Sequence, residues 1–365
     1  MENKNKLIFI IIIYGMLFLP SIIYPLVKNK MDLTNYENRT LSNLDDVVNA
    51  DFVDFSTKFD EYYKDNLPFK NELQKLRAAI KYNIFKTPTS PKVIVGKNDW
   101  LFFNSGTDGL TDEVGDYNKT TRFSDEEYKL IEKNLESVNK KVNKLKANFH
   151  LLIPNNKSSV YREYMSSLYK VDETTDQNKT EALIEKLNKD TNIDIIYPKE
   201  QLIANKNIAP TYYRYDTHWN LFGGLIGSLE LMKALENKDY NINDYHIKYK
   251  KNTKEDLLIM NQTKSLSNEL EPYVVEVEDI ECDESEDVIE CYNENAQFDK
   301  TIMLIGDSFR IAMVKSLSSI YKHVVIVYVP YFKSEYLTKY GKLDDVVYEV
   351  VERNTYQLFT IDNFF

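Results

Sequence analysis

The chain has 365 residues, of which 43% are hydrophobic and 13% aromatic, enough apolar material to bury a large folded core. Its formal net charge is −11, which argues against a nucleic-acid partner because phosphate binding requires clustered lysine and arginine. Composition therefore predicts a folded, acidic protein that does not bind nucleic acid.

The first predicted element is an uncharged segment from Leu7 to Val27 that consists almost wholly of apolar residues. As a helix rising about 1.5 Å per residue it would be about 31 Å long, close to the hydrocarbon thickness of a bilayer. A cleaved signal peptide would have a shorter apolar region of about 7–15 residues and end in small residues. Residues 1–30 are therefore predicted to form an uncleaved membrane anchor. Lysines flank it on both sides, so we take the simpler orientation, with the large acidic domain outside the cytoplasm.

Residues 31–90 are predicted to form a linker and a helical lead-in to the core. The helical pattern over residues 51–85 is broken at residues 67–69, Leu-Pro-Phe. Proline fits the first turn of a new helix better than the interior of one. We therefore expect two helices joined at Asp65–Asn66.

Residues 91–365 alternate between strand-like and helix-like segments. Short apolar runs predict strands over residues 93–95, 150–154, 193–197 and 301–305, and a last clear strand over 324–329. Helices are expected after Ser124, which opens a capping box with Glu127, over residues 177–188, over 221–235 and after Ser308. This alternation predicts an α/β fold with a mostly parallel sheet and helices on both faces. Residues 240–297 are polar and acidic and are interpreted as an insertion or an irregular β segment.

The chain contains two cysteines, Cys282 and Cys291, in an acidic segment. Their spacing suits a disulfide across a hairpin or loop if the domain lies outside the cell. Two free thiols are the alternative, because sequence does not show whether the two Cα atoms come within about 7 Å. Neither cysteine has a histidine-rich context, so no zinc site is expected.

Two short motifs carry the candidate chemistry: Asp-Thr-His-Trp at residues 216–219 and Gly-Asp-Ser-Phe at residues 306–309. Ser308 follows a predicted strand where a helix begins, which is where α/β folds keep their chemistry, although serine is also a favoured helix cap. In extended backbone Asp216 and His218 point to the same side. Asp216 could then accept from His218, and His218 could take the proton of Ser308. A surface turn and a metal site are the alternatives for Asp216 and His218. No metal is expected, because no further ligands occur at suitable spacing.

Taken together and in this order, the two motifs resemble those of the alginate O-acetyltransferase-like SGNH hydrolases, the AlgX/AlgJ-like and DHHW group. Four other segments match that group's motifs in the same order along the chain: Glu-Asn-Arg at 37–39 with Leu41, Asp-Asn-Leu-Pro-Phe-Lys at 65–70, Gly-Lys-Asn-Asp-Trp-Leu-Phe at 96–102, and Pro-Asn-Asn-Lys at 154–157 with Tyr161. Each motif is weak alone, but six in the right order are specific.

The resemblance implies an SGNH-hydrolase-like catalytic domain over residues 91–365, with Ser308 as nucleophile, His218 as base and Asp216 as the acid that orients it. It implies a single-pass, membrane-anchored, extracytoplasmic O-acetyltransferase without a cofactor. A membrane-bound O-acyltransferase would donate the acetyl group, and a surface polysaccharide would accept it.

The Ser308 amide is one expected oxyanion donor. Arg310, Asn155 and Lys157 are further candidates for oxyanion or substrate binding. Trp219 is expected to pack the histidine loop, with sugar stacking as the alternative. The group's alginate-modifying members act on an acidic polymer. This chain is itself acidic, which disfavours a polyanionic substrate. A polysaccharide acetyl esterase and a non-catalytic glycan-binding scaffold of an export complex remain alternative functions.

Overall fold

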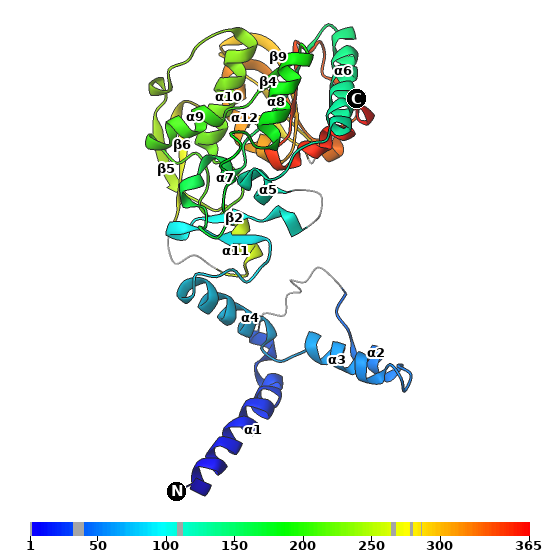
Figure 1. Cartoon of the computed structure of the whole chain (residues 1–365), viewed down its shortest axis with the longest axis vertical. Helices are drawn as coiled ribbons and strands as arrows, with labels where there is room; N and C mark the ends of the chain where they lie inside the picture. The colour runs from blue at the N-terminus through cyan, green and yellow to red at the C-terminus, as the bar shows by residue number, and fades with distance from the viewer. Residues whose placement is uncertain (1, 32–39, 108–111, 264–267, 278–279, 286) are drawn as a thin grey trace. The chain divides into compact units, whose positions relative to one another are not determined.

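The computed structural model describes residues 2–31, 40–107, 112–263, 268–277, 280–285 and 287–365. The chain divides into two compact units, Met1–Thr89 and Ser90–Phe365, whose helices and strands are labelled in Figure 1. Each unit is described by itself. The expected motif at residues 37–39 lies outside the described residues.

The first unit is helical. It contains α1 (Glu2–Val27), α2 (Leu44–Val48), α3 (Phe55–Asp65) and α4 (Lys70–Ala79), with a π-helical turn over Ile80–Ile84. The predicted pair of helices joined after Asp65 is confirmed. Among the described residues, no helix combines the length and apolar character that a membrane span needs. The anchor over residues 1–30 stays a prediction.

A seven-stranded sheet organises the second unit, in the order β4-β3-β11-β9-β10-β8-β7. The strands β4, β3, β11, β9 and β10 are parallel to one another. Strand β8 is antiparallel to β10, and β7 is antiparallel to β8. The sheet is therefore mixed, with the predicted parallel part as its larger portion. The bounds are β3 (Asn148–Leu152), β4 (Asp194–Ile196), β7 (Cys282–Glu284), β8 (Val288–Tyr292), β9 (Phe298–Gly306), β10 (Tyr321–Tyr328) and β11 (Asp345–Glu349).

Side chains on alternate positions of the central strands enter two separate apolar cores, because successive strand residues point to opposite faces. Met303 and Ile305 of β9 pack with α6 (Asp125–Lys144) and α8 (Lys179–Asp190). Ile302 and Leu304 pack with α10 (Leu221–Glu236) and α12 (Val314–Ile320). The predicted helices and the Ser124 capping box are confirmed. Shorter helices are α5 (Glu113–Asn118), α7 (Lys157–Val160), α9 (Lys199–Ala204), α11 (Asp256–Met260) and α13 (Tyr336–Lys339).

Three sequence-based expectations about the sheet are corrected. The strand at 93–95 forms, as β1 (Val93–Val95), but it pairs only with β2 (Leu101–Phe103) in a separate antiparallel hairpin. Residues 240–297 contain β structure, the second of the two interpretations, and do not form a single insertion. The antiparallel pair β5 (Ile247–Lys251) and β6 (Leu270–Val274) lies outside the main sheet, but β7 and β8 extend it. Finally, β11 was not predicted, although it lies between β3 and β9 in the sheet.

Cys282 and Cys291 form a disulfide. They are directly opposite each other in the antiparallel β7–β8 pair, which is the hairpin arrangement that their spacing suits. The disulfide therefore ties the edge strand of the main sheet to its neighbour.

Candidate active site

Ser308 lies at the turn between the end of β9 and a 3-10 helix over Ser308–Met313. Asp307 caps this helix, because its Oδ1 accepts from the Phe309 amide at 2.9 Å. The turn is crowded: a Cβ on Gly306 would lie 2.2 Å from Glu349 Oε2, so only glycine fits there without displacing a buried side chain. Ser308 itself is exposed. The turn thus presents the serine hydroxyl at the surface, above a tightly packed strand end.

His218 links the serine to Asp216. Its Nε2 lies 2.7 Å from Ser308 Oγ, and its Nδ1 lies 2.6 Å from Asp216 Oδ1. The His218 backbone amide also donates to Asp216 Oδ1, at 3.0 Å. Burial disfavours the charged carboxylate of Asp216, but the hydrogen bonds from His218 outweigh it and lower the pKa of Asp216. An ionised Asp216 fixes the tautomer in which Nδ1 carries the proton and Nε2 faces the hydroxyl.

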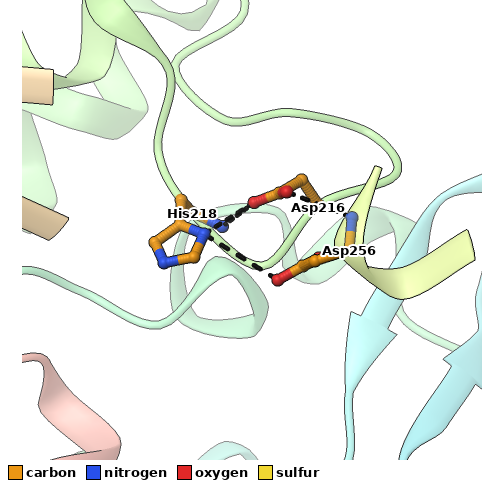
Figure 2. Close-up of side chains that lie close together, drawn as sticks. All are labelled: Asp216, His218 and Asp256. Carbon is orange, nitrogen blue, oxygen red and sulfur yellow. Dashed lines mark hydrogen bonds and ion pairs between the residues drawn. The ribbon is translucent and has the colours of Figure 1, made fainter. Parts of the chain in front are cut away.

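A second carboxylate, Asp256, reaches the same side of the imidazole. Figure 2 shows Asp216 and Asp256 beside one ring nitrogen of His218, and Asp256 Oδ2 lies 3.8 Å from Nδ1. The Asp256 amide donates to Asp216 Oδ2 at 3.2 Å, and its carboxylate accepts from the Thr217 amide and hydroxyl at 2.8 and 2.7 Å. Burial, and then the charge of Asp216, raise the pKa of Asp256. No motif singled this residue out, because it lies on α11 in a region interpreted as an insertion.

Asp216, His218 and Asp256 each offer a ligand atom to a common point, and these atoms lie within 4.8 Å of one another. The facing atoms already have partners: His218 Nδ1 is bonded to Asp216, and Asp256 Oδ2 accepts from Thr217. A metal ion would have to replace these short hydrogen bonds. We therefore interpret the three side chains as a group that holds and moves a proton.

Trp219 connects the loop that carries His218 to the 3-10 helix that begins at Ser308. Its Nε1 donates to the Phe309 carbonyl at 2.8 Å, and the side chain is only 1% exposed. Helix α10 makes room for it, since a Cβ on Gly227 would lie 2.6 Å from the indole ring. Gly224 likewise lets the Ala312 backbone approach. The expected packing role fits this placement, whereas stacking on a sugar would need an exposed ring face.

The structure does not place Lys157 as an oxyanion or substrate ligand. Its side chain is 1% exposed, and its Nζ donates to the carbonyls of Tyr213, Arg214 and Asp216 at 3.1, 3.2 and 2.7 Å. Burial lowers the pKa of Lys157 to about 8. A buried ammonium group with three carbonyl partners supports the backbone of the loop that carries Asp216 and His218.

The side chains of Asn155 and Arg310 differ in their partners. Asn155 is fully buried and its backbone carbonyl accepts from the Tyr212 hydroxyl at 2.6 Å, but among the described residues its side-chain amide has no hydrogen-bond partner. Arg310 donates from Nη1 to the Asp307 carbonyl at 2.8 Å, and its guanidinium lies 4.4 Å from the centre of the Tyr328 ring. Neither lines the hollows that meet at Ser308. Their predicted contact with an oxyanion or substrate stays a prediction.

Two hollows share Ser308. The larger, about 580 Å³, is lined by Tyr213, Asp216, His218, Trp219, Leu221, Thr253, Lys254, Glu255, Asp256, Ile259, Glu271, Ser308, Phe309, Ile311 and Ala312. The smaller, about 360 Å³, is lined by Asp307 with Tyr328, Val329, Pro330, Asn354, Gln357, Thr360 and Phe364. Both volumes lie in the range of about 300–1,000 Å³ that is usual for small-molecule sites. The exposed hydroxyl can thus be approached by two groups.

A protein-family model described as the SGNH hydrolase-like domain of the acetyltransferase AlgX matches residues 93–325, which include both motifs. The chain belongs to this family. The predicted resemblance is confirmed, and membership places the protein among SGNH hydrolase-like acetyltransferases. No curated protein sequence matches the chain significantly.

Several solved structures are similar to this chain, and the first of them shares its fold. Bacillus cereus PatB1 with a sulfonyl adduct is 16% identical, with a TM-score of 0.51, over 73% of this chain and 99% of that one. A DHHW family protein from Eubacterium siraeum is 13% identical, with a TM-score of 0.49, over 75% of this chain and 98% of that one. The O-acetyltransferase domain of Pseudomonas putida AlgJ is 16% identical, with a TM-score of 0.45, over 75% of this chain and 99% of that one.

Proposed function

We propose that the protein is an O-acetyltransferase that carries an acetyl group on Ser308 and passes it to a hydroxyl of a polysaccharide outside the cytoplasm. The observation that carries this proposal is the hydrogen-bonded series from Asp216 through His218 to Ser308, with distances of 2.6 and 2.7 Å. A nucleophile, a base and an orienting acid at such distances are the requirements for serine acyl transfer.

In the first half-reaction His218 Nε2 takes the proton of the Ser308 hydroxyl while Oγ attacks the carbonyl carbon of an acetyl ester. The tetrahedral intermediate collapses when the bond to the donor's oxygen breaks, and His218 returns the proton to that oxygen. Acetyl-serine and the free donor alcohol result. Asp216 stabilises the imidazolium that exists between the two proton transfers.

In the second half-reaction an acceptor hydroxyl occupies the place of the departed alcohol. His218 takes its proton, the acceptor oxygen attacks the acetyl-serine, and the proton then passes to Ser308 Oγ as it leaves. The acetyl ester is now on the acceptor, and the enzyme is restored. No oxidant, reductant or cofactor is needed for either half.

The oxyanion of each tetrahedral intermediate requires hydrogen-bond donors that are already in position. The Ser308 amide is one candidate, because it belongs to the first residue of a helix and the first amides of a helix have no partner within it. The helix N-terminus also carries a partial positive charge.

An extracytoplasmic location is part of the proposal. The Cys282–Cys291 disulfide supports it, since such bonds persist in oxidising compartments. The uncharged run from Leu7 to Val27 supports an N-terminal anchor at the cell membrane. Acetyl-coenzyme A is made in the cytoplasm, so a membrane-bound O-acyltransferase is the proposed partner that delivers the acetyl group.

The exposure of Ser308 favours a second candidate, a polysaccharide acetyl esterase, because water can reach the same acyl-serine. The chemistry is identical up to the acceptor. The two functions differ in whether a sugar hydroxyl displaces water in the second half-reaction.

The full chain and a chromogenic acetyl ester test the proposal. Release of the chromophore and acetylation of the peptide that contains Ser308, detected by mass spectrometry, are expected for the wild type and for Ser334→Ala. Ser334 is an exposed serine on another segment and serves as the matched control. Ser308→Ala should lose both signals. If wild type and Ser308→Ala release the chromophore at the same rate, the protein is a non-catalytic scaffold. Oligosaccharides that gain acetyl groups distinguish transfer from hydrolysis.

A further inference from the structure

The smaller hollow at Ser308 is built mainly from the C-terminal segment, which the reaction steps above do not use. Asn354, Gln357, Thr360 and Phe364 line it, together with residues 328–330 at the end of β10. Its volume of about 360 Å³ lies at the lower end of the usual range for small-molecule sites. This size suits one ring of a larger molecule.

The hollow offers no free charge among the described residues that line it. Asp307 is the only lining carboxylate. Its Oδ1 accepts from the Phe309 amide at 2.9 Å, and its Oδ2 accepts from the Val351 amide at 3.0 Å and lies 3.5 Å from Asn354 Nδ2. Because these donors occupy the carboxylate, the remaining lining presents neutral groups to a ligand.

Those neutral groups combine hydrogen bonding with aromatic surface. In the part of the chain that the structure describes, the Gln357 amide has no hydrogen-bond partner, so it can both donate and accept. Thr360 adds a hydroxyl. Phe364 is 41% exposed, and the Tyr328 ring is held in place by the Arg310 guanidinium. Amides and hydroxyls match the hydroxyls of a sugar, and aromatic faces match its C–H surface.

We propose that this hollow binds a neutral sugar unit of the acceptor and directs one of its hydroxyls to the acetyl-serine. The proposal rests on the transferase function and adds the substrate class. It includes no new covalent step, because the acceptor hydroxyl reacts as in the second half-reaction above.

The larger hollow gives a contrast that supports this assignment. Its lining includes four carboxylates and one ammonium group: Asp216, Glu255, Asp256 and Glu271, with Lys254. A uronate acceptor would meet these carboxylates on one side of Ser308 and find no cation on the other. The net charge of −11 for the chain acts in the same direction, since it repels a polyanionic polymer.

Competition between acceptors tests the sugar class. The full chain is given a chromogenic acetyl ester with cellotetraose or with a tetramer of galacturonate at equal concentration. Acetyl groups on each oligomer are counted by mass spectrometry. We expect at least about tenfold more acetylation of the neutral oligomer, a difference equivalent to about 1.4 kcal/mol. Equal or greater acetylation of the uronate overturns the proposal, as does acetyl-serine that forms without transfer to the neutral oligomer. Absence of acetyl-serine in the wild type refutes the transferase function itself, and this inference with it.

Variants locate the site. Gln357→Ala and Phe364→Ala should raise the KM for cellotetraose by about fivefold to tenfold, the effect of losing one hydrogen bond or one ring contact. Their effect on the burst of acetyl-serine should be much smaller, and a retained burst also shows that the variant has folded. The matched controls are Gln201→Ala on α9 and Phe52→Ala, since neither residue lines the hollow. An unchanged KM in both Gln357→Ala and Phe364→Ala overturns the assignment.

Discussion

Replacing Asp256 with asparagine tests whether the second carboxylate beside His218 acts by its charge. Asparagine has nearly the same size, and its carbonyl oxygen can still accept from the Thr217 amide, which now donates to Asp256 at 2.8 Å. The negative charge 3.8 Å from His218 Nδ1 is lost. The substitution therefore separates electrostatic support of the imidazolium from support of the loop.

The size of the effect follows from that distance. Two unit charges about 4 Å apart interact by about 4 kcal/mol at an effective dielectric of 20 and by about 1 kcal/mol in water. The two side chains are 28% and 27% exposed, so we take about 1–2 kcal/mol, nearer the value in water. This corresponds to a fall in kcat of about tenfold.

The assay is hydrolysis or transfer with a chromogenic acetyl ester, followed across the acid limb of the pH profile. Asp176→Asn is the control, because it removes the charge of an exposed aspartate that lines neither hollow. Burial and the charge of Asp216 raise the pKa of Asp256, so the wild type loses this support as the pH falls and its advantage in kcat over Asp256→Asn should shrink. A ratio of the two kcat values that stays constant as the pH falls would refute the electrostatic role and leave Asp256 as a support for Thr217 alone.

Three further substitutions have definite expected results. Asp216→Asn turns an amide nitrogen either toward His218 Nδ1 or toward the Asp256 amide, and both arrangements disfavour the histidine tautomer with the proton on Nδ1. The kcat should fall by about 10³–10⁴-fold, and a loss below tenfold would contradict the role of Asp216. Gly227→Ala places a Cβ 2.6 Å from the Trp219 ring and should lower the free energy of unfolding by about 1–3 kcal/mol in a urea titration, so unchanged stability would contradict the packing argument. Lys157→Met leaves three carbonyls without their donor and should lower the free energy of unfolding by about 3 kcal/mol or more, and a smaller loss would show that the ammonium group is not supporting the loop.

The features that sequence predicted well are local ones. A capping box, an apolar helix face and a buried apolar run each depend on neighbouring residues, so the helix after Ser124 and the strand before Gly306 could be recognised directly. The position of Ser308 could be predicted in the same way, because it follows the end of this strand directly. The pairing of His218 with Ser308 came from residue chemistry and family resemblance, as 90 residues separate them.

The features that sequence missed depend on contacts between distant segments. Strand β11 begins with Asp345 and ends with Glu349, and two buried acids argue against a central strand. In the structure His150 Nε2 lies 3.0 Å from Asp345, and Glu349 lies under the Gly306 turn. The partners of Lys157, a candidate for oxyanion or substrate binding, could not be predicted for the same reason: the three carbonyls that hold it come from a loop more than fifty residues away.

Asp307, which sequence explained as a helix cap, has a larger role in this arrangement. One carboxylate oxygen caps the 3-10 helix that begins at Ser308 by accepting from the Phe309 amide, and the other accepts from the Val351 amide, just beyond the end of β11. Burial and the charge of Asp307 raise the pKa of Glu349 well above its ordinary value, which favours the neutral form of Glu349 beside Asp307. The same carboxylate therefore fixes the position of Ser308 relative to the C-terminal segment that begins beyond Val351 and lines the smaller hollow. The proposed chemistry at the serine and the proposed binding in that hollow both depend on one buried hydrogen-bonded turn.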